Sequence, residues 1–291
     1  MSNSGSDYEL KFAMHDTIHC LTPGLFRSLK RGERKLSKLE VSYEFGDGER
    51  IEFSGPEPLG DDDLRVLQGL IAMAGPQGEI LAPTTESPEG LSIRRMLELR
   101  WGAVNEESLV VRGSYRSLAK EIGYAEIEKS NTIRDCIERL WKVSVIAQKD
   151  GKRLGFRLLA DYASDDPNGQ LFVALNPRLA SAVLGDKYTR IDMNEVRQIK
   201  QGGTRLIHQR LCGWIDHGKS RKVGGDMLCS YVWPDPVDET AMRKRRSRLK
   251  PLLAELLAIG WSVKQYSKGK FEIKRPALSR SDDGPLQHNL F

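Results

Sequence analysis

The sequence has little cysteine and no long apolar run, and both absences narrow the class of protein. Its four cysteines are scattered over 291 residues without a CxxC pair, so we interpret them as reduced thiols. No apolar run approaches the roughly 20 residues that cross a membrane. Residues 1–7 are polar and lack the apolar core of a signal peptide. We therefore expect a cytoplasmic protein with no membrane partner.

The sequence also lacks the residue groupings of an enzyme. No set of Ser, His and Asp indicates nucleophilic catalysis, and the His-x-His with a following helical Tyr that a rolling-circle nickase needs is missing. His15, His19 and Cys20 have a spacing that metal ligands use, but no partner cluster lies nearby in the sequence. We prefer to interpret that spacing as fortuitous. We therefore expect no catalytic residue, no metal and no cofactor.

One segment matches the pattern of a nucleotide-binding motif but lacks the secondary structure that the motif needs. Residues 213–220 fit the P-loop pattern GxxxxGK[ST]. A P-loop must follow a buried strand and begin a helix. Here an amphipathic helical pattern precedes the motif, and residues 221–225 cannot continue a helix well. Trp214 and Ile215 are also bulky for a loop that wraps phosphate, so we reject this site.

A basic octapeptide is the most informative segment that the sequence does contain. Six of the eight residues 243–250 are basic and none is acidic. The segment runs into apolar residues at 249, 252, 253, 256 and 257, the spacing of a buried helix stripe. Pro251 should kink this helix, or two helices should meet there. A hairpin pattern follows at 261–266 and 270–275, so helix and hairpin together predict a DNA-binding winged helix.

Charge is concentrated in this same region. Residues 240–275 carry 11 Lys and Arg against two acids, a local charge of +9 in a chain whose total is +5. The remainder of the chain is therefore slightly acidic. A basic face on such a body indicates an anionic partner, and nucleic acid is the usual one.

The same plan occurs earlier in the chain. A short helix at 115–122, a longer helix from Ser130 and a basic-tipped hairpin around 149–152 are typical of a winged helix-turn-helix. A shift of 117 residues aligns Leu140 with Leu257, Ile146 with Val263, Leu154 with Phe271 and Phe156 with Ile273. We interpret this as a degenerate internal repeat.

The predicted fold class is α+β, with two tandem winged helix-turn-helix domains. A hairpin at 39–53 and a helix from Asp61 precede the first set of helices, and Asn176-Pro177 begins a helix in the second domain. A short helical piece is expected around Leu25 and Leu29. The predicted boundaries are an N-terminal arm at 1–37, domain 1 at 38–163, a linker at 164–169, domain 2 at 170–276 and a flexible, disordered tail at 277–291.

Both domains offer residues for DNA. Arg can bind guanine through two hydrogen bonds, and either basic side chain can neutralise phosphate. In domain 1 the candidates are Lys129, Ser130, Asn131, Thr132 and Arg134 for the groove, Tyr115, Arg116 and Lys120 for phosphates, and Lys149, Lys152 and Arg153 on the wing. In domain 2 they are Arg243, Lys244, Arg245, Arg246, Arg248 and Lys250 on the helix, and Lys264, Lys268, Lys270 and Lys274 on the wing.

Two alternatives stay open within these sets. The domain 1 helix also carries Asp135 and Glu138, so that domain could serve mainly for protein contacts. In domain 2, Arg243, Arg246, Ser247 and Lys250 share one flank of the helix, whereas Arg245 lies above Leu249 and could pack its stem there.

The last five residues resemble the bacterial sliding-clamp binding pentapeptide. Gln287 is followed by Leu290 and Phe291, so a flexible tail could present two apolar side chains to an apolar pocket, with the Gln as polar anchor. The motif is short, and an inert tail end is the preferred alternative.

Several longer segments resemble one family. Residues 15–26 (HDTIHCLTPGLF), 31–35, 51–60, 135–144, 208–216 and 242–246 are similar to RepC, the replication initiator of IncQ-type broad-host-range plasmids. The resemblance spans about residues 12 to 276 and weakens at both ends and at 82–95. It implies binding to direct repeats, called iterons, in double-stranded origin DNA of a bacterial plasmid. It also implies opening of adjacent A/T-rich DNA and cooperation with a plasmid helicase and primase. A winged-helix transcriptional repressor of plasmid genes is the alternative, and a structural protein without a DNA role is a third possibility.

Overall fold

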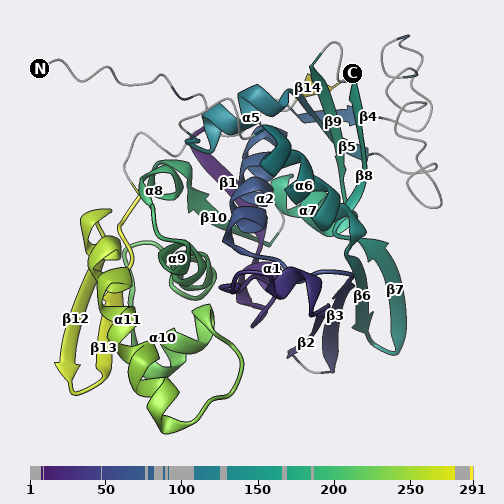
Figure 1. The fold of residues 1–291 in the computed structure, drawn as a ribbon. Helices are drawn as coiled ribbons and strands as arrows, with labels where there is room; N and C mark the ends of the chain where they lie inside the picture. Colours follow the sequence, from purple (N-terminus) through teal and green to yellow (C-terminus); the bar gives the residue numbers. More distant parts are fainter. Residues whose placement is uncertain are drawn as a thin grey trace, which may run out of the picture.

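The computed structural model describes residues 8, 10–46, 48–75, 78–81, 88, 91, 108–124, 130–165, 169–184, 187–278 and 289–290 (Figure 1). They form a mixed α+β fold whose main apolar core runs through both halves of the chain, with a small second cluster of Val110, Phe172 and Ala174. Among these residues, no helix is both long enough and apolar enough to cross a membrane.

The second half of the chain contains a complete winged helix. Its elements are α9 (Gly202–Trp214), β11 (Ser220–Gly224), α10 (Gly225–Val232), α11 (Glu239–Ala258), β12 (Ser262–Ser267) and β13 (Lys270–Lys274). The sheet has the order β11-β13-β12, with antiparallel pairing throughout. The expected helices and wing are confirmed, whereas β11 was not expected as a strand.

Helix α11 is continuous through Pro251. Asp238 caps its first turn, because its carboxylate accepts a 2.7 Å hydrogen bond from the Ala241 N–H. Leu249, Leu252, Leu253 and Leu256 are buried, and each contributes about 1.5–3 kcal/mol. Pro251 lies on the exposed side of the helix. The alternative of two helices that meet at Pro251 is therefore wrong. The expected apolar stripe is also one residue too long, because Leu257 is 50% exposed.

The first half contains a second set of the same elements. They are α2 (Asp61–Ala74), α5 (Tyr115–Glu121), α6 (Ser130–Lys142), β6 (Ser144–Lys149) and β7 (Lys152–Arg157). The expected hairpin, β2 (Leu39–Phe45) and β3 (Glu49–Gly55), extends this wing into a sheet of order β2-β3-β6-β7. Figure 1 shows the two hairpins side by side at one end of the molecule.

Helix α2 is the central helix of the fold. It contacts α6, α9, β1 and β5, and most of its residues are buried. A Cβ atom on Gly69 would lie 2.3 Å from Ile122 Cγ2 and 2.6 Å from Leu118 Cδ1, so only glycine fits where α5 crosses α2. From its other side, the Gln68 Nε2 group donates to Gln209 Oε1 on α9 over 2.6 Å. The helix therefore joins the two halves.

The expected linker is part of a sheet. β8 (Leu159–Asp165) and β9 (Gln170–Leu175) pair with each other in an antiparallel hairpin, and β9 also pairs with β5 (Ser108–Gly113). The full order is β14-β4-β5-β9-β8, with β4 at Gly78–Leu81 and β14 at Asn289–Leu290. Ser164 and Asp165 therefore belong to strand β8, and strand 170–175 belongs to the first half.

The expected arm is also part of the packed body. β1 (Phe12–Asp16) pairs with β10 (Tyr188–Asp192), and α1 (Thr17–Leu21) packs against α9. The helical piece expected around Leu25 and Leu29 is wrong, since the helical turns are α1 and a 3-10 turn at Glu33–Lys35. Helices α7 (Pro177–Val183) and α8 (Met193–Gln198) flank β10, and Asn176 caps α7 as expected.

Strand pairing within the two wings confirms part of the expected repeat and corrects the rest. Phe156 pairs with Val145, and Ile273 pairs with Val263. Phe156 and Ile273 therefore correspond, as the sequence predicted, but Val263 corresponds to Val145 rather than to Ile146. The expected alignment of Leu140 with Leu257 in the repeat is also wrong, because Leu140 is buried and Leu257 is half exposed.

Candidate nucleic-acid interface

The outer face of α11 presents a row of exposed polar and basic side chains. Arg243 is 78% exposed, and its only ion pair among the described residues is a 3.6 Å contact with Glu239 one turn earlier. Lys244 and Lys250 are exposed and have no ion pair within the described part of the chain. The Arg248 guanidinium lies 4.9 Å from the centre of the Trp233 ring. This face can therefore meet a polyanion without first breaking strong contacts.

Two arginines of the same helix are occupied. Arg245 donates to the Trp233 and Asp235 carbonyl oxygens over 3.0 and 2.7 Å, so it holds the segment before α11. Arg246 donates from Nε and Nη2 to the two carboxylate oxygens of Asp226 over 2.6 and 2.7 Å, and from Nη1 to Glu239 over 2.8 Å.

These contacts tie Arg246 to α10 as well as to its own helix. Hydrogen bonds to Asp226 and then Glu239 raise the pKa of Arg246 further above its usual range, and the same bond lowers the pKa of Asp226. The expected flank of Arg243, Arg246, Ser247 and Lys250 thus contains one residue that braces the helix-turn-helix.

The second wing is basic on all of its strands. The exposed lysines with no ion pair in the described ranges are Lys264, Lys268, Lys270 and Lys274. Beside them, β11 adds Lys222, whose Nζ lies 5.2 Å from the Tyr266 ring centre, and Arg221, which lies over Trp214 at 5.5 Å. Sequence reasoning missed these two residues because it treated 221–225 only as the exit of a P-loop. The segment has one apolar residue, Val223, and no alternation, so no local signal indicated a strand.

The first helix-turn-helix presents fewer free charges. Asn131 is exposed and Thr132 is half-buried at the start of α6. The Arg134 guanidinium lies 5.3 Å from the Tyr115 ring centre. Ser130 is the first residue of α6, and Lys129 lies outside the described residues.

The phosphate contacts expected from α5 need one correction. Arg116 and Lys120 are exposed. Tyr115 is only 9% exposed and belongs to the core, so its hydroxyl cannot reach a DNA phosphate. Tyr115 therefore packs in the core and is not a phosphate contact.

The first wing carries cations that are already paired. Lys149 Nζ lies 2.5 Å from Glu49 Oε1, and Arg153 Nη2 lies 3.8 Å from Glu52 Oε2. The hydrogen bond to Glu49 raises the pKa of Lys149. Both acids come from β3, the strand that lies beside β6. Of the three predicted wing residues, only the exposed Lys152 has no ion pair in the part of the chain that the structure describes.

A buried carboxylate holds α6 against the body. Asp63 has no exposed surface, and its two oxygens each lie 2.9 Å from an arginine, Arg139 on α6 and Arg34 on the loop before β2. The Gly60 N–H also donates to it over 2.7 Å. A buried charge that is this fully hydrogen-bonded fixes the geometry of the elements that supply its partners.

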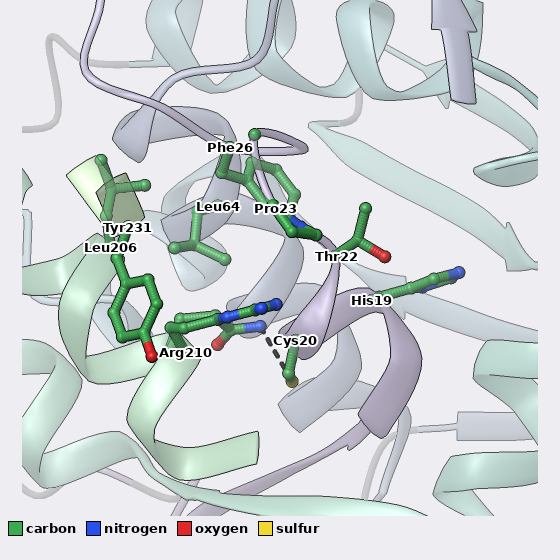
Figure 2. Close-up of a pocket in the computed structure, with 11 residues that line it drawn as sticks. His19, Cys20, Thr22, Pro23, Phe26, Leu64, Leu206, Arg210 and Tyr231 are labelled. Carbon is green, nitrogen blue, oxygen red and sulfur yellow. Dashed lines mark hydrogen bonds between the residues drawn. The ribbon is translucent and has the colours of Figure 1, made fainter. Parts of the chain in front are cut away.

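A small cavity lies where the two halves meet. Its volume is about 20 Å³, enough for about one water. Figure 2 shows Arg210 beside Tyr231, and the dashed line is the 3.1 Å hydrogen bond from Gln209 to the sulfur of Cys20. This space cannot hold a nucleotide.

The residues with metal-like spacing do not form a ligand set. The rings of His15 and His19 lie 6.1 Å apart, and burial lowers the pKa of both, to about 4 for His15. Within the described residues, the one group of three metal-ligand side chains is Glu195, His208 and Cys212.

In that second group, His208 and Glu195 form a buried ion pair. His208 Nε2 lies 2.6 Å from Glu195 Oε2, which also accepts from Trp261 Nε1 over 3.1 Å. Burial opposes the charge on the imidazole, but Cys212 and Glu195 together raise the pKa of His208 to about 10. The short contact between nitrogen and oxygen is that of a charge-assisted hydrogen bond.

The P-loop-like segment has the wrong surroundings for phosphate. It begins within the last turn of α9, which ends at Trp214, and its last residue, Ser220, begins β11. A P-loop requires a strand followed by a helix, and here the order is reversed. The local structure expected around the motif, a helix before it and no helix continuing from it, is confirmed.

The sequence and the fold both match known replication proteins. A family profile described as Replication protein C (RepC) matches residues 7–277. The chain belongs to the RepC family. Members of this family are plasmid replication initiators, which bind DNA and are not enzymes. No curated protein matches the sequence significantly.

Solved structures with a similar fold are known for this RepC-family chain. A crystal structure of domains 2 and 3 of RctB covers 89% of this chain and 98% of its own, with a TM-score of 0.56 and 12% identity. A second RctB structure, of residues 155–483, gives 0.55 with 11% identity and covers 90% and 97%. The Pi initiator protein in complex with iteron DNA gives 0.47 with 12% identity and covers 73% and 89%. The two RctB structures support the α+β tandem winged-helix fold.

The C-terminal motif is only partly described for this RepC-family chain. Gln287 and Phe291 lie outside the described residues. Leu290 belongs to β14, which pairs in parallel with Ile80 and its neighbour on β4. The clamp-binding motif therefore stays a prediction.

Proposed function

We propose that this protein initiates plasmid replication by binding iterons in double-stranded origin DNA, with α11 in a major groove. The observation that carries the proposal is the set of unpaired lysines on the second winged helix. Six exposed lysines on α11 and its wing have no ion pair among the described residues. Each cation that neutralises a phosphate releases counterions, which is the main source of affinity for DNA.

The residues divide into base-reading and phosphate-binding sets. Arg243, Ser247 and Lys250 lie on the exposed face of α11 and are suited to the groove, as is Lys244 on its neighbouring flank. The wing lysines are suited to flanking phosphates. Arg246 can read a base only with the donors that Asp226 and Glu239 leave free.

The first winged helix would contact the next turn of the duplex. Asn131 at the start of α6 would approach the base edges, and Arg116 and Lys120 of α5 would bind phosphates. Two linked winged helices on one face of DNA would cover roughly two helical turns. With its wing cations paired, this domain could also contact other replication proteins.

Melting follows from several copies bound to tandem repeats. Together they would bend or strain the origin and destabilise flexible A/T-rich steps nearby. Recruitment of a plasmid helicase and primase completes the proposal, and the sliding clamp could bind the tail through Gln287, Leu290 and Phe291.

The test is a footprint of the full chain on origin DNA over a series of salt concentrations, followed by permanganate probing. We expect protected direct repeats, a steep loss of affinity with salt, and reactive thymines in an adjacent A/T-rich tract. Protected repeats without reactive thymines at any occupancy would favour the repressor. Binding that is insensitive to salt and to sequence would contradict a DNA role.

The clamp contact has its own test. Purified sliding clamp is incubated with the wild type and with a Leu290→Ala/Phe291→Ala variant, and the bound fraction is measured. We expect retention by the wild type only. Equal retention of the clamp by both proteins would rule out the motif.

A further inference from the structure

A short basic loop between the two winged helices has no role in the binding scheme above. Residues 30–38 are the second part of the segment that connects α1 to β2, and they contain the 3-10 turn Glu33–Lys35. Four of their cations, Lys30, Arg31, Lys35 and Lys38, are exposed and have no ion pair within the described residues. The one acid, Glu33, is neutralised by Arg27 at 2.7 Å. The loop is therefore a dense positive surface. We call it the basic loop.

The basic loop is attached to both halves of the molecule. From inside it, Arg34 reaches the buried carboxylate of Asp63 on α2. From the residues just before it, Arg27 pairs with Asp235 at 2.9 Å, ahead of α11, and the Ser28 N–H donates to the Val232 carbonyl at the end of α10 over 2.9 Å. In Figure 1 this N-terminal part of the chain lies between α9 and the β2-β3 hairpin. These contacts fix the basic loop beside the junction of the two winged helices.

The loop presents one apolar side chain among these cations. Leu36 is 88% exposed, whereas the next most exposed large apolar residue in the described ranges, Leu154, is 61% exposed. The loop holds Leu36 in place, because the N–H groups of Leu36 and Ser37 both donate to the Glu33 carbonyl, over 3.0 and 3.1 Å. The Lys30 N–H also donates to the Glu33 side chain over 2.8 Å. A leucine in this position is displayed on an ordered turn.

We propose that the basic loop enters the minor groove of iteron DNA between the two winged helices, with Leu36 as an apolar wedge. The proposal rests on the proposed function, because that function supplies the duplex. Two winged helices that read successive major grooves from one side face the intervening minor groove at their junction. Proteins that enter a minor groove combine basic residues with an apolar side chain that partly unstacks one base step and bends the duplex. The loop carries both, and the bend would favour opening of nearby DNA.

The test measures bend and salt dependence separately with the full chain. Bending of an iteron duplex is measured by circular-permutation gel mobility for the wild type, Leu36→Ser and the control Leu184→Ser, which alters a 47% exposed leucine outside the proposed interface. Salt dependence is measured for Lys30→Ala/Arg31→Ala/Lys35→Ala and for the charge-matched control Lys11→Ala/Lys187→Ala/Lys200→Ala.

We expect Leu36→Ser to bind iterons but to lose most of the bend, while Leu184→Ser bends DNA as the wild type does. We expect the loop triple variant to reduce the slope of log affinity against log salt by about 0.9 for each phosphate that the loop no longer neutralises. An unchanged bend for Leu36→Ser overturns the wedge, and a slope equal to that of the control triple overturns the DNA contact.

The salt series is repeated on a duplex without iterons, so that the loop is tested even if iteron recognition fails. Loss of iteron binding by Lys244→Ala/Lys250→Ala together with normal behaviour of both loop variants would leave the proposed function standing and reject the loop. The reverse pattern would reject α11 as the main contact and retain the loop.

Discussion

The two wings of this protein share a strand-turn-strand plan but differ in whether their cations are paired with acids. In the first, Lys149 and Arg153 lie against Glu49 and Glu52 of the neighbouring strand. In the second, the neighbouring strand is β11, which supplies Lys222 and Arg221 in place of acids. The strand beside a wing thus decides whether its cations are available to DNA. One fold, used twice, therefore carries one wing with paired cations and one wing whose lysines are free for the DNA contact proposed above.

The largest difference expected between the two domains is in stability. Asp63→Asn leaves Arg34 and Arg139 without their buried carboxylate, and removal of one partner of a buried ion pair costs about 3–5 kcal/mol of unfolding free energy. Asp226→Asn breaks an exposed pair in the second domain and should change stability little. Urea unfolding of both variants measures the contrast. Equal losses would show that the first domain is no more tightly braced than the second.

The response to pH should also differ between regions. Burial lowers the pKa of His15 to about 4. Its contribution to the free energy of unfolding is therefore complete above pH 6.5, the pKa in the unfolded chain. About 3 kcal/mol of that free energy is lost as the pH falls from 6.5 towards 4. The pKa of His208 is raised to about 10, so its contribution is complete below pH 6.5 or so and is lost as pH rises.

Hydrogen exchange over a pH series measures both effects. Acid should first expose the amides of β1 and α1, and alkali should first expose those of α9. A His15→Gln variant should weaken the acid response at β1. The same order of exposure at both extremes would contradict the assignment.

Arg246 tests how the second domain reads sequence. Arg246→Ala should lower the affinity for an iteron duplex by about tenfold or more if the residue reads a base, with a smaller effect on a duplex of unrelated sequence. Gel-shift titration of both duplexes measures the ratio. If affinity for both falls equally, Arg246 acts as a brace or a phosphate contact. Asp226→Asn is the matched control, because it breaks the brace and keeps the arginine.

The smallest effect expected comes from freeing the first wing. Glu49→Gln/Glu52→Gln removes the carboxylates that hold Lys149 and Arg153. We expect a severalfold gain in affinity at low salt and a slope steeper by up to about 1.8, which is the counterion release of two added cations. Glu40→Gln/Glu44→Gln, on the outer strand β2, is the matched control. A gain that is equal in the two variants would reflect net charge alone.

Local patterns in the sequence predicted several helices, whereas the strand pairing depends on residues far apart in the chain. The apolar spacing of α11 and the Asn176-Pro177 start of α7 could be read from adjacent residues, and both are confirmed. The pairing of β1 with β10 joins residues more than 170 positions apart, and no local signal indicates it. Segment 164–169 has the composition of a linker, yet its first two residues lie in strand β8, which pairs with β9, and composition alone does not show such pairing.

The candidate site shows the same division. The basic octapeptide identified α11 correctly, yet the sequence could not show that Arg246 is held by Asp226, twenty positions away on another helix. It also could not show that Lys149 faces Glu49 across a sheet. Such pairs become visible only when the fold brings the strands together.

The most direct test of this division between the domains compares two triple variants on one iteron duplex over a range of salt concentrations. Lys244→Ala/Lys250→Ala/Lys270→Ala removes three unpaired cations of the second domain, and Lys142→Ala/Lys149→Ala/Arg153→Ala removes three paired cations of the first. We predict that the first variant binds about a hundredfold more weakly at low salt, with a slope reduced by about 2.7, and that the second stays close to the wild type. Equal losses of affinity in the two variants, or a larger loss in the second, would contradict the claim that the unpaired cations of the second domain supply most of the affinity for DNA.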